Sequence, residues 1–170
     1  MSEEPDAPAG RPPTQKALAV ATAVLSLLAG VNVWLGYRDS QLRHSESVHR
    51  DMVAAARDGA VSLTTIDHRQ ADQAVQRILD ASTGAFRDDF EQRATGFIDA
   101  AEKAQSQSVG TVADAGLESV DGDTGRVLVA MTVMTSNRGV PERAPRAWRM
   151  RVTVIPDNGS YKVSSVEFIA

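Results

Sequence analysis

The sequence predicts an α+β domain that follows a single membrane-spanning helix, in a chain of 170 residues. Three observations predict this architecture. Residues 17–37 form a run without charges, and residues 41–105 carry apolar side chains at helical spacing. Residues 108–169 alternate, are rich in β-branched side chains and contain Asp-Gly and Asn-Gly turn signals. The overall composition, 42% hydrophobic and 24% charged, therefore averages over segments of different kinds.

The uncharged run at 17–37, between Lys16 and Arg38, is long enough to cross a membrane, since a span needs about 20 apolar residues. A signal peptide is the alternative, but its apolar core is usually only about 7–15 residues long. Trp34 and Tyr37 suit a membrane interface, which favours an uncleaved anchor. Residues 1–16, rich in Pro, Ala and charge, are expected to form a disordered tail.

The basic residues on the two sides of the run do not decide its orientation. A long domain is translocated largely regardless of charge, whereas a short tail is easily retained. We therefore expect a single-pass protein of the plasma (inner) membrane, with a cytoplasmic N-terminus and an extracytoplasmic (periplasmic) C-terminal domain.

One face of the predicted span carries mainly small side chains at a spacing of four and three residues. Such a stripe permits close helix packing in lipid, and a nearby asparagine would favour a polar partner. The alternative is an accidental stripe in an alanine-rich helix. The candidates for membrane packing are Thr22, Ser26, Ala29, Asn32, Val33 and Gly36.

Three helices are expected before the strands begin. Apolar side chains at helical spacing predict an outward helix over residues 38–66 that continues from the membrane, and residues 67–170 form the remainder of the domain. Asp67 is placed to cap the next helix. A second helix is predicted over 71–81 and a third over 85–105, separated by the break Ser82-Thr83-Gly84.

Four consecutive strands with short links predict an antiparallel meander. Helices that precede such a sheet cover one concave face of it, which gives a cone-like α+β roll. We expect Phe86, Phe90, Phe97, Met131 and Met134 to fill the interior, as core rather than as a ligand site. The predicted strands are 108–120, 126–136, 148–155 and 161–169.

The sequence offers little catalytic chemistry. The absence of cysteine excludes thiol nucleophiles and cysteine-ligated metals, and His44 and His49 are not spaced to share one helical face. Nucleophile-elbow, phosphate-loop and dinucleotide motifs are missing. We expect no enzymatic activity, no metal and no cofactor. A net charge of −4 also argues against nucleic-acid binding.

A basic segment near the C-terminus contrasts with the acidic balance of the chain. A solvated outer sheet face is one interpretation, and docking to an acidic partner surface is the other. Arg149 and Arg151 should share a face opposite Trp148 and Met150, because side chains alternate along a strand. The docking candidates are Arg138, Arg143, Arg146, Arg149 and Arg151.

Three stretches resemble the Mce-associated membrane proteins of actinobacteria. They are AAARDGAVSLTTIDHRQADQAVQRILDASTGAFRDDF (54–90), SVGTVADAGLESVDGDTGRVLVAMTVMTSN (108–137) and the closing RMRVTVIPDNGSYKVSSVEFIA. Their shared motifs are helix junctions and turns, so they indicate a common fold and carry no information about catalysis.

The resemblance implies a cone similar to nuclear transport factor two and to the periplasmic domain of a type IV secretion assembly factor. It also implies an accessory or stabilising subunit of Mce transporters, which import lipids across the cell envelope. The expected partners are the permease and the extracytoplasmic tunnel proteins, with a homo-oligomer also possible. The alternative function is a membrane-anchored cone domain that binds a small molecule or a lipid.

Overall fold

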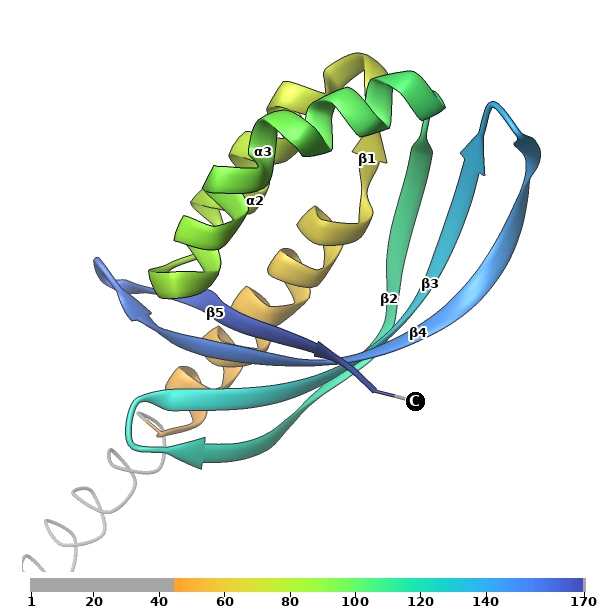
Figure 1. The fold of residues 1–170 in the computed structure, drawn as a ribbon. Helices are drawn as coiled ribbons and strands as arrows, with labels where there is room; N and C mark the ends of the chain where they lie inside the picture. Colours follow the sequence, from red (N-terminus) through yellow and green to blue (C-terminus); the bar gives the residue numbers. More distant parts are fainter. Residues whose placement is uncertain (1–44, 170) are drawn as a thin grey trace, which may run out of the picture. The chain divides into compact units, whose positions relative to one another are not determined.

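A curved antiparallel sheet carries helices on its concave face (Figure 1). The computed structural model describes residues 45–169 and, for residues 141–144, the backbone alone. The predicted tail, the span at 17–37 with its packing candidates, and residues 38–44 lie outside the described residues. Within 45–169, no helix is long and apolar enough to cross a membrane.

The helical part follows the predicted order. A helix covers 45–64 and ends two residues before the predicted boundary. Asp67 caps the following turn, because its Oδ1 atom accepts a hydrogen bond of 3.0 Å from the Arg69 backbone N–H. The subsequent elements are β1 (Ile66–Asp67), the 3-10 helix η1 (His68–Gln70), α2 (Ala71–Asp80) and α3 (Gly84–Ala104).

The break between α2 and α3 is fixed to the sheet. Ser82 forms an isolated bridge with Val163, and the Thr83 N–H donates to the Val163 carbonyl at 2.9 Å. Gly84 follows with φ +59°, a conformation that glycine adopts readily. The predicted break at 82–84 is therefore the point where the helical layer is tied to the last strand.

The sheet has five strands in the order β1-β2-β3-β4-β5, with all neighbours antiparallel. The sequence predicted four, because β1 is a two-residue pairing too short to leave a periodic pattern. The Asn158-Gly159 turn is confirmed, with φ +50° and +83° at its two residues. The remaining strands are β2 (Gln107–Asp121), β3 (Thr124–Asn137), β4 (Val140–Asp157) and β5 (Ser160–Phe168).

Strand β4 begins at Val140 rather than at the predicted Trp148. Pro141 and Pro145 concealed this part of the strand, since proline cannot donate to a sheet ladder. Here β4 pairs only with β3, because its pairing with β5 starts at Met150. Proline is tolerated at such an unpaired edge.

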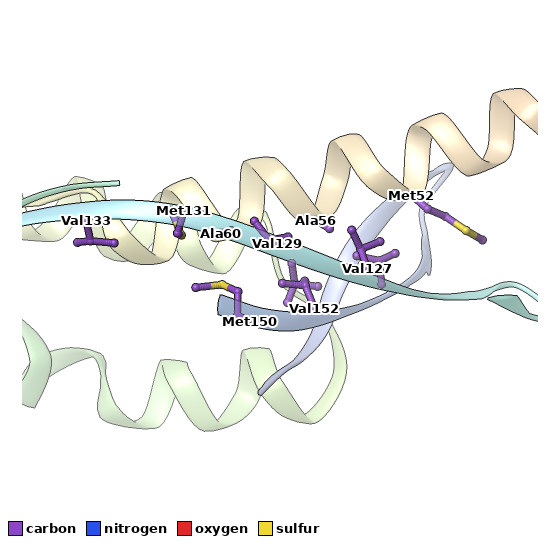
Figure 2. Packing of buried hydrophobic residues seen from close by; sticks show 11 residues of the cluster. Met52, Ala56, Ala60, Val127, Val129, Met131, Val133, Met150 and Val152 are labelled. Atoms are coloured by element: carbon purple, nitrogen blue, oxygen red, sulfur yellow. The ribbon is translucent and has the colours of Figure 1, made fainter. Parts of the chain in front are cut away.

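The core lies between the helix at 45–64 and strands β3 and β4 (Figure 2). Met52, Ala56 and Ala60 occur at a spacing of four residues, so they form one stripe along the helix. The inward residues of the two strands alternate with exposed or half-buried ones, as a half-solvated sheet requires. These inward residues are Val127, Val129, Met131, Val133, Met150, Val152 and Val154.

Candidate functional site

A cavity of about 630 Å³ is lined by residues from the end of α3, the start of β2 and the β3–β4 hairpin. Figure 1 shows that these segments lie at the same end of the domain. The helix at 45–64 and β1 complete its walls. Most lining side chains are apolar. They are Leu63, Ile66, Phe97, Ala100, Ala101, Ala104, Val133, Val140 and Trp148, accompanied by Thr64, Ser106, Ser108, Thr135, Asn137 and Arg146.

Small side chains on α3 leave this space open. Ala100, Ala101 and Ala104 line the cavity from the last turns of the helix, and Ala101 is the one buried residue of α3. Phe97 stands beside them, with its ring 5.7 Å from the ring of Phe90. Phe97 was expected to be core, whereas the structure places it in a cavity wall.

Besides the hydroxyl groups of Ser106, Ser108 and Thr135, the cavity has two nitrogen donors, on Asn137 and Arg146. The carboxamide oxygen of Asn137 already accepts bonds of 2.9 Å from the N–H groups of Gly139 and Val140, which leaves its NH2 group as the free donor. The exposed Arg146 forms no ion pair with any described side chain, and no described carboxylate lines the cavity. Together these donors make the polar part of the cavity suited to an anion.

The arginine candidates do not form one strip. The Nε and Nη2 atoms of Arg151 donate to the two carboxylate oxygens of Glu118 at 2.6 and 2.8 Å. Its Nη1 atom lies 3.2 Å from Glu167 Oε2, so these contacts link residues of β2, β4 and β5. Arg149 lies on the same outer face and is exposed, opposite the buried Met150 as alternation predicts.

The remaining candidates are dispersed. Arg146 belongs to the cavity, and Arg138 lies at the hairpin turn with its Nε 3.5 Å from Gln105 Oε1. The side chain of Arg143 lies outside the described residues.

The pairing of Arg151 changes the acidity of its main partner. The hydrogen bonds and charge of the guanidinium lower the pKa of the Glu118 carboxyl, and Arg126 adds a smaller effect in the same direction. The pKa of Arg151 is raised by the same partners. Arg151 is therefore engaged in ion pairs within the sheet, which makes it a poor reporter of partner binding.

Between residues 45 and 169 the described side chains contain no group of three His, Asp or Glu placed to hold a metal ion. The Nδ1 atom of His68 lies 3.6 Å from Asp67 Oδ1, and no second histidine among the described residues belongs to this pair. No signal in the sequence marked Asn137 as a cavity residue, because its polar side chain also fits the hairpin turn that it closes.

Comparison with known proteins settles the family. The family model described as "Uncharacterized protein Rv1363c/MT1408-like" matches residues 14–170. The chain belongs to this Rv1363c/MT1408-like family. One family relative, "Uncharacterized protein Rv1363c" of Mycobacterium tuberculosis, is 37% identical over 169 residues. That alignment covers 94% of this chain and 62% of the relative, so the chain spans less than two thirds of the length of this relative.

Solved structures show where else this fold of the Rv1363c/MT1408-like family occurs. The periplasmic domain of DotI is 12% identical with a TM-score of 0.56, covering 69% of this chain and 91% of that one. An IcmL-like type IV secretion system protein of Legionella pneumophila is 12% identical with a TM-score of 0.55, and the match covers 69% of this chain and 88% of that protein. CagV, a VirB8 homologue of the Helicobacter pylori type IV secretion system, is 9% identical with a TM-score of 0.53, and the match covers 70% of this chain and 96% of CagV. The predicted α+β fold is therefore confirmed. The predicted likeness of this fold to a periplasmic domain of a secretion protein is also confirmed.

Proposed function

We propose that this chain is a membrane-anchored, non-catalytic accessory subunit of a Mce-type lipid-import complex in the cell envelope. The observation that carries the proposal is the fold shared with periplasmic domains of type IV secretion proteins, which belong to envelope assemblies. The apolar run at 17–37 supplies the anchor, and the motifs at 54–90 and 108–137 supply the resemblance to Mce-associated proteins.

The chemistry of the described domain supports a role without catalysis. The cavity contains no described acid or histidine that could move a proton, and its charged group is the exposed Arg146. An accessory subunit acts instead through its surfaces. The small-residue stripe of the span would pack against the permease, and the outer sheet face would dock on extracytoplasmic tunnel proteins or on a second copy.

Arg149 is the best position at which to test docking. It is exposed on the outer face and forms no ion pair with a described residue, whereas Arg151 is engaged with Glu118 and Glu167. Charge reversal in Arg149→Glu therefore changes the outer surface without breaking an internal contact. Arg77→Glu, on the exposed side of α2, is the matched control.

The experiment is native purification of the tagged full chain in mild detergent, followed by identification of the proteins recovered with it. We expect transporter subunits with the wild type and with Arg77→Glu, and about tenfold less of them with Arg149→Glu at low salt. Recovery of the chain without any transporter subunit would overturn the proposal. Equal recovery with Arg149→Glu at several salt concentrations would remove Arg149 from the docking surface.

A second candidate function is binding of a small molecule or lipid inside the cone. The observation that favours it is the cavity of about 630 Å³, which falls within the range of about 300–1,000 Å³ common to ligand pockets. Side chains expected to fill the interior, such as Phe97, stand in its wall and leave it open. The two candidate functions are compatible, since one uses the outer face and the other uses the interior.

A further inference from the structure

We propose that the cavity binds a single anionic amphiphile of the fatty-acid type. The carboxylate would lie at Arg146 and Asn137, and the apolar chain would lie along the wall that contains Phe97 and Trp148. This inference rests on the second candidate function and names its ligand class and its contact residues. It does not depend on association with a transporter.

The walls of the cavity select an apolar body. Two aromatic rings, Phe97 and Trp148, stand among aliphatic side chains from five elements of the fold. The buried Thr64 adds little polarity, because its hydroxyl already donates to the Ala60 carbonyl at 2.7 Å. A hydrocarbon chain gains free energy when it leaves water for such surroundings, whereas a sugar or a peptide would lose hydrogen bonds there.

The polar groups of the cavity select an anion at one end of that body. Arg146 offers up to five N–H donors, and the free NH2 group of Asn137 adds two more. No described carboxylate at the cavity competes for them. Because Arg146 is exposed, it marks the side of the cavity that meets water, which is where the head of an amphiphile belongs.

Other ligand classes fit less well. A cation would meet an arginine and no described acid. A neutral sterol would fill the apolar part but would leave Arg146 without a counter-ion. The acyl chain of a membrane phospholipid is the second source of the same chemistry, and the experiment is designed to separate it from a free acid.

Trp148 provides a direct readout, because it lines the cavity and its ring lies 5.4 Å from Phe168 in an edge-to-face arrangement. The full chain carrying Trp34→Phe retains Trp148 as its single tryptophan. In detergent solution, this protein would be titrated with dibromostearic acid, whose bromine atoms quench indole fluorescence on contact. Parallel titrations would use the methyl ester of the same acid and a dibrominated phosphatidylcholine.

We expect saturable quenching by the acid, with half-saturation at about tenfold higher concentration for the ester, since a charge-assisted hydrogen bond is lost. Arg146→Gln should weaken binding of the acid by a similar factor and leave binding of the ester unchanged. Arg149→Gln, on the opposite face of the same strand, should behave like the Trp34→Phe parent. Ala104→Phe should abolish quenching, because the larger side chain occupies the cavity.

Equal potency of acid and ester, or an unchanged affinity in Arg146→Gln, would overturn the assignment of an anionic head. Saturable quenching by the phospholipid alone would overturn the free acid as the ligand. Quenching that survives Ala104→Phe would show that the bromine atoms reach Trp148 from outside the cavity, which would overturn the site. Recovery of transporter subunits, measured separately, tests the accessory role, so failure of one proposal is distinguishable from failure of the other.

Discussion

A Cβ atom placed on Gly59 would lie 2.4 Å from the Cγ2 atom of Val163. The helix at 45–64 therefore touches β5 through its glycine, and Val163 is itself 1% exposed in the core. Glycine inside a helix costs about 1 kcal/mol relative to alanine, because the unfolded chain has more freedom to lose. The close approach to β5 accounts for a residue that, in the sequence, is only a weak point of the helix.

Gly59→Ala should destabilise the domain by about 1–3 kcal/mol, because overpacking against Val163 outweighs the gain in helix propensity. Unfolding of the full chain in detergent by urea, followed by circular dichroism, measures this change. Val163→Ala removes the clashing Cγ2 atom, so the double variant should lose less stability than the sum of the two single variants.

Gly96 supplies the matched control for Gly59. It also lies within a helix, α3, but a Cβ atom there would meet no heavy atom within 4 Å. Gly96→Ala should therefore stabilise the domain by up to about 1 kcal/mol. A stability gain of the same size in Gly59→Ala would contradict the contact between this helix and β5.

Gly110 marks a second close approach, between β2 and the end of the helix at 45–64. A Cβ atom there would lie 2.0 Å from Thr64 Oγ1 and 2.7 Å from Met131 Cε. Gly110→Ala should lower the free energy of unfolding by about 1–3 kcal/mol. Gly116→Ala, in the same strand but with no atom within 4 Å of its Cβ, should change it by less than about 0.5 kcal/mol. Equal losses would show that both effects come from the strand backbone.

Much of this fold is predictable from local patterns. The apolar residues of α2 recur at helical spacing, and Val75, Ile78 and Leu79 are buried as that pattern requires. The Asp-Gly and Asn-Gly pairs indicated two of the hairpins, and Gly122, Asn158 and Gly159 in these turns adopt positive φ. These signals are local, so a single sequence contains them.

The features that the sequence did not predict depend on distant contacts. The cavity lies between α3 and the end of the β3–β4 hairpin, and no local pattern indicates that Ala104 and Arg146 line the same cavity. The strand register brings Arg151 to Glu118 and Glu167, and extra residues in β2 and β5 shift that register. Register and cavity shape emerge only when the sheet is assembled.

Met131 and Met134 were both expected in the interior, but strand β3 places their side chains on opposite faces of the sheet. Met131 is 2% exposed in the core, whereas Met134 is 36% exposed, because an odd spacing puts it on the outer face. Met131→Ala should cost about 2–5 kcal/mol of unfolding free energy, and Met134→Ala less than about 0.5 kcal/mol. Urea unfolding of the two variants tests this, and similar losses would contradict the observed register of β3.

The contact between Arg151 and Glu118 predicts a stability that depends on pH. The pKa of Glu118 is lowered in the folded domain, so the pair stabilises the fold above the unfolded value of about 4.3. That contribution disappears as the pH falls through the lowered native pKa, because protonation removes the negative charge. At pH 7 the wild type should melt above Arg151→Gln, and the two melting temperatures should converge in acid.

Salt and a neighbouring arginine provide the controls for this pair. The partners are partly exposed, so raising the salt concentration at pH 7 should reduce the difference in melting temperature. Arg149→Gln changes an arginine of the same face that has no described ion-pair partner, and it should melt like the wild type at every pH. A difference for Arg151→Gln that stays constant with both pH and salt would instead assign its role to packing of the aliphatic stem on the sheet.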